Sequence, residues 1–384
     1  MGERIRVLIA ITRMEMGGAQ RVVLDTAAGL DRDRFTVALA WGPGDPLDDE
    51  ARGLDDVRRF EIHDLVREVR PAADCRALQA LRRAIAEVRP HIVHTHSSKA
   101  GILGRAAARL EQAPSVVHTI HGWGFTPLQS PPVRAGFFAA ERLAARWTDR
   151  FVAVSERNRA QGVELGLFDP ERCDVIRAGV RLERFRGRVD VDAVRRRLAL
   201  PSTAPVVVQV GNFKPQKGPL DFIRVASSVA HEVPEARFVM VGDGPLREAA
   251  EALAAELGVA DRLVFPGWWD DIPGLLGVAA VSVLTSRHEG LPCAVVESLA
   301  AGVPVVATAV DGTPEAVRHG RNGLLAPAGD VVALAGHVIR VLREPATAAR
   351  LAAGAADGLD EFSTSTMIRR QEEQYACLAA SIRS

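Results

Sequence analysis

Two glutamates, Glu289 and Glu297, lie in a segment whose other residues are mostly small or apolar. The segment follows a short Val-rich run, Val281–Leu284, that predicts a buried strand. Pro292 suits the first turn of a helix, where its missing N–H costs no hydrogen bond, and Gly302 suits the position after the helix ends. We therefore predict that Glu289 lies in a loop and that Glu297 lies inside a helix.

The predicted helix is apolar nearly all round, so it is expected to be buried. A buried carboxylate is costly unless something binds it. Glu297 therefore either bonds a backbone amide or an Arg, or accepts hydrogen bonds from ligand hydroxyls. The helix start, Gly290 to Cys293, offers free amides and the positive end of the helix dipole, which suit a diphosphate. The two glutamates are eight positions apart, about 12 Å if the stretch were fully helical, so they are poor candidates to share a proton and fit opposite ends of a long ligand better.

A basic loop, Gly211–Gly218, directly follows another predicted strand. It reads Gly-Asn-Phe-Lys-Pro-Gln-Lys-Gly and holds Lys214 and Lys217, two of only three lysines in the chain. Fixed cations at the end of a strand suit a diphosphate and stabilise the charge that a departing nucleoside diphosphate gains, without a metal. The alternative is a solvated turn that carries two lysines by chance.

These motifs together resemble a known family of enzymes. Glu289-Gly-Leu-Pro292 with Glu297 eight positions after Glu289, then Gly302-Val-Pro-Val-Val-Ala-Thr308, Gly312-Thr-Pro-Glu315 and Gly320-Arg-Asn-Gly323, resemble the signature of retaining glycosyltransferase family 4. The resemblance implies an α/β chain of the GT-B fold, in which two Rossmann-like domains with parallel sheets face each other across a cleft. It also implies transfer of a hexose-type sugar from a nucleoside-diphosphate sugar, such as a UDP-sugar, to a hydroxyl of a saccharide or lipid-linked acceptor. Polysaccharide or glycolipid biosynthesis is the expected setting.

The resemblance assigns roles to residues of the second half of the chain. Glu289 and the backbone of Gly290 and Leu291, next to Pro292, would hold the donor sugar, and Glu297 would hold the ribose. Lys217 matches a family lysine, whereas the position of Asn212 is often Arg in the family, so we expect Lys214 to supply the second charge. Trp268, in Phe265-Pro-Gly-Trp-Trp269, would lie near the nucleobase, with simple aromatic packing as the alternative. Val241-Gly-Asp-Gly-Pro-Leu246 is a weak nucleotide signal that most often marks a tight turn.

The first half carries weaker signals. Gly17 and Gly18 open a helix after the first strand and resemble a family turn that nears the donor diphosphate, although a plain strand-to-helix turn reads the same way. His121, just before Gly122, resembles the active-site histidine of the family and would contact the donor sugar. We thus predict His121, Glu289 and Lys217 as catalytic residues.

Half of the ten histidines cluster near the ends of two predicted strands, at positions 91, 94, 96, 118 and 121. No carboxylate partner or tight ligand spacing supports a metal site among them. The two Asp-x-Asp triplets, at 31–33 and 190–192, lie in charged segments away from strand ends. We expect no metal and no other cofactor, and we expect the remaining histidines to be structural or to face the acceptor.

Short β-rich runs alternate with helical segments of about 10–15 residues, which predicts βαβ units and parallel sheets. The 384 residues suit two domains rather than one core. We predict domains at 1–180 and 189–365, a linker near Arg177–Arg188, and a last helix at about 366–384 that returns to the first domain. The predicted strands are Arg6–Ile11, Thr36–Ala40, His91–His94, Ser115–Thr119, Arg150–Val154, Asp174–Ile176, Pro205–Val210, Arg237–Val241, Arg262–Phe265, Val281–Leu284, Val303–Ala307 and Gly323–Leu325.

Residues Val133–Arg150 have a helical pattern. One stripe is apolar and another face carries Arg142, Arg146 and Arg150. This is either an ordinary surface helix or a patch that touches a membrane peripherally.

Composition excludes several classes of function. The formal net charge is zero, so the general basic field of a nucleic-acid-binding protein is absent. The four cysteines are scattered without zinc or disulfide spacing, which favours a reducing cytoplasm. Val7 to Ile11 is too short for a signal sequence, and no apolar run could cross a membrane, so we expect a cytoplasmic protein, at most peripheral on the inner face of the membrane.

Two rival functions stay open. A nucleotide-sugar 2-epimerase shares the expected fold, and a non-catalytic partner could bind a nucleotide-sugar without transfer. A nicotinamide enzyme is disfavoured because the Gly-x-Gly-x-x-Gly motif with its downstream acid is missing.

Overall fold

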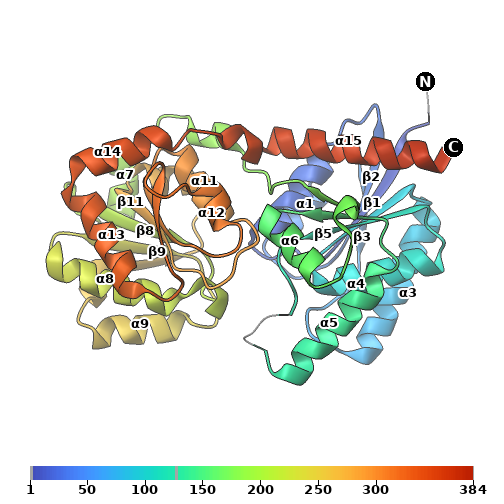
Figure 1. Ribbon diagram of the computed structural model, residues 1–384, viewed down its shortest axis with the longest axis horizontal. Coiled ribbons are helices and arrows are strands. Elements are labelled where there is room, and N and C mark those ends of the chain that lie inside the picture. The colour runs from blue at the N-terminus through green and yellow to red at the C-terminus, as the bar shows by residue number, and fades with distance from the viewer. Residues whose placement is uncertain (1–2, 126–128, 384) are drawn as a thin grey trace. The chain divides into compact units, whose positions relative to one another are not determined.

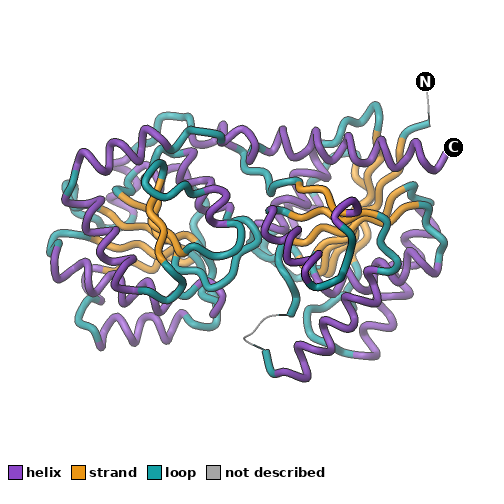
Figure 2. Tube along the Cα trace, in the orientation of Figure 1, coloured by secondary structure: helices purple, strands orange, loops and turns teal. Residues whose placement is uncertain are grey.

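The computed structural model describes residues 3–125 and 129–383 (Figure 1). The chain divides into two compact units, Met1–Gly179 with Thr364–Ser384, and Val180–Ser363. The first boundary lies inside the predicted linker, Arg177–Arg188, and the rest of that linker, including the 3-10 turn η2 (Leu182–Phe185), belongs to the second unit. Strands and helices alternate along both units (Figure 2).

The first unit is built on a parallel sheet which, in the described residues, has seven strands in the order β3-β2-β1-β4-β5-β6-β7. The central strands are almost wholly buried, as expected for Val, Ile and Ala runs covered on both faces. The strands are β1 (Ile5–Arg13), β2 (Phe35–Gly42), β3 (Val57–Glu61), β4 (Ile92–His96), β5 (Ser115–Ile120), β6 (Arg150–Ala153) and β7 (Cys173–Val175).

Helices cover both faces of this sheet. The first-unit helices are α1 (Gly18–Gly29), α2 (Asp48–Arg52), α3 (Pro71–Val88), α4 (Ser98–Leu110), α5 (Pro131–Ala145), α6 (Glu156–Glu164) and, from the far end of the chain, α15 (Thr364–Arg383), with the 3-10 turn η1 (Pro170–Arg172). Helices α3 and α4 bury their apolar sides on the central strands. Helix α15 packs on α1, β1, β4 and β5, where its Tyr375 is fully buried beside Phe35. The last twenty-residue helix is therefore part of the core of the first unit.

The second unit repeats the plan with a parallel sheet that, within the described residues, has six strands in the order β10-β9-β8-β11-β12-β13. Its strands are β8 (Val206–Val210), β9 (Arg237–Val241), β10 (Leu263–Gly267), β11 (Val281–Leu284), β12 (Val305–Thr308) and β13 (Gly323–Ala326). Its α-helices are α7 (Val191–Arg197), α8 (Pro219–Glu232), α9 (Arg247–Glu256), α10 (Ile272–Gly277), α11 (Cys293–Ala300), α12 (Thr313–Ala316), α13 (Val331–Arg343) and α14 (Pro345–Gly354). Its 3-10 turns are η2, η3 (Pro215–Lys217), η4 (Ala260–Arg262) and η5 (Leu359–Phe362).

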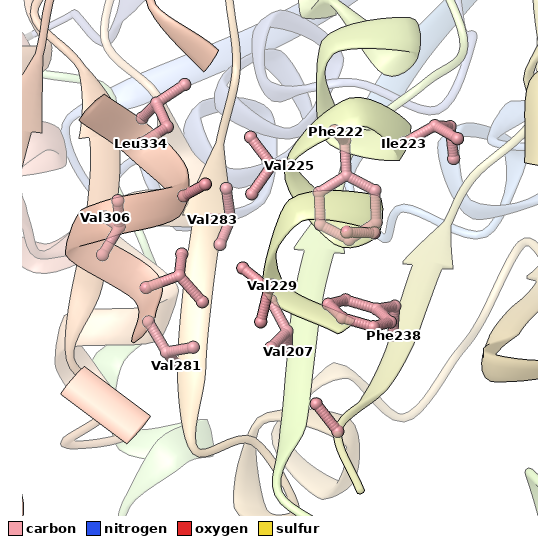
Figure 3. Close-up of a cluster of buried hydrophobic side chains, with 14 of the residues drawn as sticks. Val207, Phe222, Ile223, Val225, Val229, Phe238, Val281, Val283, Val306 and Leu334 are labelled. Atoms are coloured by element: carbon pink, nitrogen blue, oxygen red, sulfur yellow. The ribbon is translucent and has the colours of Figure 1, made fainter. Parts of the chain in front are cut away.

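The larger core of the second unit lies between the sheet and helices α8, α9, α13 and α14 (Figure 3). Phe222 of α8 meets Phe238 of β9 edge to face, with ring centroids 6.5 Å apart. A second cluster fills the other face beneath α7 and α10. Strands held on both faces leave their carboxyl ends as fixed platforms for the loops that follow.

Two sequence-based predictions are wrong. The edge strand β3 was not predicted, because three of its five residues are charged, which resembles a loop, and only Val57 is buried. The predicted helix Val133–Arg150 ends earlier, since α5 stops at Ala145 and Arg150 opens strand β6. Trp147, predicted as the last residue of the apolar stripe, and Arg150 therefore lie beyond the helix. The other predicted strands are all present, with small shifts at their ends.

Candidate functional site

Two loops of the second unit, residues 211–218 after β8 and residues 285–292 after β11, are bonded to each other, and we call them the paired loops. Strands β8 and β11 are neighbours in the sheet. The Thr285 hydroxyl donates towards two carbonyl oxygens, that of Lys217 at 3.0 Å and that of Gly218 at 2.9 Å. The side-chain amide of Gln216 donates to the carbonyl oxygen of His288 at 2.9 Å, and the Arg287 amide donates to the carbonyl oxygen of Gln216 at 2.7 Å. The paired loops are thus one locally rigid structure.

Gly218 is required where the paired loops meet. Its φ is +60°, in the left-handed region, and a Cβ there would lie 2.3 Å from the carbonyl oxygen of Thr285. Any other residue would push the loops apart.

Glu289 is the most constrained carboxylate of the paired loops, with 6% of its surface exposed. Its Oε1 accepts from Lys217 Nζ at 2.6 Å and from Ser286 Oγ at 2.6 Å. Its own amide donates to Asp311 Oδ2 at 2.7 Å. Both side-chain bonds fall on Oε1, so in the described structure Oε2 remains available to accept from a ligand hydroxyl.

The structure confirms that Glu289 lies in a loop and that Glu297 lies inside a helix, α11. Cys293, in the first turn of α11, has its thiol pKa raised to about 12, first by burial and then by the negative charges of Glu297 and Glu289, with Lys217 acting in the opposite direction. The thiol therefore stays protonated at neutral pH. These three charged groups gather around the start of α11, and Glu297 is half-buried one turn beyond Cys293.

The start of α11 also presents unused donors. Gly290 and Leu291 are buried, and within residues 3–125 and 129–383 their amides donate to no acceptor. The Lys217 ammonium, bonded to Glu289 directly before these two residues, adds positive charge to the same loop. Unused amides, a helix dipole and a cation are features that suit an anion such as a diphosphate.

Two further loops of the second unit, those after β9 and β10, are joined backbone to backbone with the paired loop at 211–218. The Gly211 amide donates to the Val241 carbonyl oxygen at 3.0 Å, and the Gly242 amide donates to the Gly267 carbonyl oxygen at 2.9 Å. A Cβ at Gly242 would lie 2.3 Å from the Gly211 carbonyl oxygen. The glycines of Val241–Leu246 therefore allow this close approach, which supports the loop that carries Asn212 and Lys214 rather than marking a nucleotide motif by themselves.

The tryptophan pair after β10 is split between two roles. Trp269 is buried, donates from Nε1 to the Asp271 carbonyl oxygen at 3.0 Å and lies under the Arg197 guanidinium, 3.8 Å from the ring centroid. Trp268 is 44% exposed. The packing alternative thus describes Trp269, and Trp268 remains the residue able to meet a ligand.

In the first unit, histidines at the ends of β4 and β5 form what we call the histidine cluster, made of His94, His96, His118 and His121. His96 Nδ1 lies 2.9 Å from His121 Nε2, and the two rings are stacked with centroids 5.2 Å apart. The centroids of the His96 and His94 rings are 4.2 Å apart. His94 bonds Tyr375 of α15 and, through Nε2 at 2.7 Å, Thr119 Oγ1.

Burial lowers the pKa of every member of the histidine cluster. The pKa is about 3 for His94 and about 4 for His121, and those of His96 and His118 also lie well below the ordinary value. The cluster is therefore neutral at pH 7.

The predicted glycine turn lies at the end of β1. Gly17 is the N-cap of α1, with extended backbone, and a Cβ there would lie 2.7 Å from the flexible end of Gln20. Ser97, after β4, links this edge to β1 because its Oγ accepts from the Thr12 amide at 3.1 Å. His121, Gly17 and Gly18 thus follow strands of the first sheet, whereas Asn212, Lys214, Lys217, Trp268 and residues 289–297 belong to loops and a helix of the second unit.

Sequence reasoning missed residues that hold the predicted ones. Ser286 and Asp311 bind Glu289, and His96 binds His121. Asp311 directly precedes the Gly312-Thr-Pro-Glu315 motif and follows a strand, which is the signal that could have pointed to it. In the part of the chain that the structure describes, no group of three His, Cys, Asp or Glu side chains is placed to hold a metal ion, and no helix is long and apolar enough to cross a membrane.

The two halves of the chain match two different family models. Residues 16–184 match the model described as Glycosyltransferase Family 4, and residues 190–357 match that of Glycosyl transferases group 1. The UDP-Gal:alpha-D-GlcNAc-diphosphoundecaprenol alpha-1,3-galactosyltransferase of Escherichia coli is 33% identical over 331 residues, covering 85% of each chain. The chain belongs to glycosyltransferase family 4. A D-inositol 3-phosphate glycosyltransferase of Thermobispora bispora is 32% identical to this glycosyltransferase, covering 79% of this chain and 75% of that relative.

Solved structures confirm the predicted GT-B fold. Anabaena HepE, crystallised with UDP and glucose, superposes with a TM-score of 0.84 at 21% identity, covering 97% of this chain and 100% of that one. Sucrose-phosphate synthase from Thermosynechococcus elongatus gives a TM-score of 0.86 at 22% identity, covering 99% and 100%. At these identities the likeness concerns the fold.

Proposed function

We propose that this glycosyltransferase moves a hexose-type sugar, with retention, from a nucleoside-diphosphate sugar to a hydroxyl of a lipid-linked or saccharide acceptor in polysaccharide or glycolipid biosynthesis. The observation that carries the proposal is the site at the start of α11, where Glu289, Lys217 and two unused buried amides lie together. The similarity to a galactosyltransferase whose name gives UDP-Gal as donor and a diphosphoundecaprenol acceptor supports both substrate classes.

In this proposal the donor lies along the paired loops. The diphosphate takes the Gly290 and Leu291 amides and the Lys217 ammonium, with Lys214 and Asn212 as further contacts. Glu289 Oε2 accepts from sugar hydroxyls beside Pro292, Glu297 accepts from the ribose, and Trp268 covers the nucleobase. Gly17 and Gly18 of the first unit are proposed to allow close approach to the diphosphate and sugar.

The proposed reaction forms a bond between the acceptor oxygen and the anomeric carbon and breaks the bond from that carbon to the diphosphate oxygen. The acceptor attacks the face that the diphosphate leaves, and its proton passes to the departing phosphate oxygen. Lys217 and the α11 amides stabilise the charge that grows on the diphosphate, so no bound metal is needed. His121 contacts the donor sugar and orients it.

Transfer is tested with purified full-length enzyme, UDP-galactose and related nucleotide-sugars, and acceptors of two kinds, a polyprenyl-diphosphate-linked sugar and free saccharides. We expect one donor–acceptor pair to give an α-linked product with Glu289→Gln nearly inactive and Glu256→Gln, on the exposed surface of α9, fully active. A β-linked product would contradict retention. Epimerised donor in the absence of acceptor would favour the 2-epimerase, and donor binding without transfer would favour the non-catalytic partner.

Helix α5 is the proposed membrane contact. Val133 and Leu143 are each 48% exposed, and Arg142 and Arg146 are exposed on the same helix and its end. We expect the protein to co-float with anionic but not neutral vesicles, and expect the double variant Arg142→Glu and Arg146→Glu to lose this binding while Arg83→Glu, exposed on α3, keeps it. Equal flotation of both variants would contradict the contact and, with it, a location at the inner face of the membrane.

A further inference from the structure

The arrangement of His96 restricts which nitrogen of His121 can carry its proton. His96 Nδ1 and His121 Nε2 are 2.9 Å apart, so the bond between two neutral rings holds one proton. His96 is fully buried, and its other nitrogen, Nε2, has no hydrogen-bond partner in the described residues. Whether Nε2 of His96 carries a proton depends on which of the two rings donates the hydrogen bond.

The two directions leave different groups unpaired. If His121 donated from Nε2, the His96 proton would lie on Nε2, and a buried N–H would have no acceptor. If His96 donates from Nδ1, its Nε2 is only a bare lone pair. Orphaned buried N–H groups are rarer than under-satisfied acceptors, so the second direction is favoured.

We propose that His96 is a positioning residue that donates its Nδ1–H to His121 Nε2 and thereby holds His121 as a neutral imidazole with its proton on Nδ1. His121 then offers a donor, not an acceptor, from Nδ1. A sugar hydroxyl or ring oxygen that meets this nitrogen must accept. The lowered pKa of both rings, caused by burial, agrees with two neutral partners.

The surroundings of His96 support a fixed ring. Its ring centroid lies 4.2 Å from that of His94 and 5.2 Å from that of His121. His94 is hydrogen-bonded at both nitrogens, to Tyr375 and Thr119, so its ring cannot rotate to become a partner for Nε2 of His96. His118 offers an internal comparison, because it is also buried and its Nδ1 lies 2.9 Å from Thr95 Oγ1 rather than from His121.

The tautomer is tested directly, without substrate, by two-bond ¹H–¹⁵N spectra of full-length protein labelled with ¹⁵N in the imidazole rings. We expect the Nδ1–H tautomer for both His96 and His121. His96→Asn, whose amide can donate from the Nδ1 position, should keep His121 in that tautomer. His96→Gln, which places its amide at the Nε2 position, should let His121 gain protonation at Nε2. An Nε2–H His121 in the wild type, or an unchanged tautomer in His96→Gln, would overturn the proposal.

The kinetic consequence rests on the proposed function. We expect His96→Gln to lower kcat roughly tenfold with little change in the KM for the donor, since one hydrogen bond of ordinary strength is lost in the transition state. His96→Asn should restore most of kcat, and His118→Asn should leave kcat unchanged. If the tautomers behave as expected but the wild type transfers no sugar, the proposed function fails and the assignment of His96 stands. If transfer is normal and His96→Gln keeps its full kcat, the positioning role is wrong.

Discussion

The histidine cluster of the first unit and the paired loops of the second unit both bury polar side chains, but they do so by different means. Both place polar side chains within or directly after neighbouring parallel strands, β4 with β5 and β8 with β11. The histidine cluster buries its groups by keeping them neutral, whereas the paired loops bury Glu289 by pairing it with Lys217. The stability of the first unit is therefore expected to depend on pH, and that of the second unit on charge pairing.

The largest expected effect is that of replacing Lys217 in the paired loops. Lys217→Met removes both the cation proposed for the diphosphate and the partner of buried Glu289, so kcat/KM should fall by about 10²–10³ and the second unit should lose up to about 3 kcal/mol. Steady-state kinetics and urea unfolding measure the two effects. Lys99→Met is the matched control, because Lys99 bonds Asp74 at 2.6 Å in the first unit. Equal loss of activity in both variants would remove the special role of Lys217.

The next largest effect is a loss of folding stability in the first unit at acid pH. Histidines that are neutral when folded take up protons on unfolding below their ordinary pKa of about 6.5, so stability falls as pH drops from about 6.5 towards the folded values, near 4 for His121 and 3 for His94. Each buried histidine adds a slope of about 1.4 kcal/mol per pH unit in that window. Hydrogen exchange at pH 7 and pH 5 should show loss of protection in β4 and β5 well before β8 and β11.

The variant His118→Asn isolates one such slope, since Asn does not titrate. Its unfolding free energy should depend on pH less steeply than that of the wild type below pH 6.5. Parallel pH dependences would show that the buried histidines are not the source of acid sensitivity.

Sequence patterning was enough to predict the buried parallel strands and the loop and helix positions of Glu289 and Glu297, because both follow from local rules. Val/Ile runs predict buried parallel strands, and Pro292 and Gly302 bound the helix that carries Glu297. Edge strand β3 was not predicted because only one side of it contacts the core. The supports of the site, such as Asp311 for Glu289 and His96 for His121, depend on loops that approach each other only in the folded chain.

A moderate effect is expected at the contact between the paired loops. Gly218→Ala must fit a Cβ 2.3 Å from the Thr285 carbonyl oxygen at a φ of +60°. Gly258→Ala has a φ of +69° with nothing within 4 Å of its Cβ, so it pays only backbone strain of about 1 kcal/mol. Gly218→Ala should lose clearly more stability than this control and should weaken donor binding. Equal losses in thermal unfolding would mean that the loops can separate without cost.

The smallest expected effect is that of a chelator. If Lys217 and the α11 amides stabilise the diphosphate, EDTA should leave kcat within about twofold of its value, because no metal bond is broken. Loss of activity that added Mg²⁺ or Mn²⁺ restores would show that charge pairing in the paired loops is incomplete without a metal.

The central claim, that the carboxylate inside α11 binds a sugar nucleotide, is tested most directly by donor-induced thermal stabilisation of Glu297→Ala. Wild type and the control Glu256→Ala should both be stabilised by the donor, by about 2.7 kcal/mol at a hundredfold excess over Kd. Glu297→Ala should fold normally and show little or no stabilisation at the same concentration. Full stabilisation of Glu297→Ala would contradict the account.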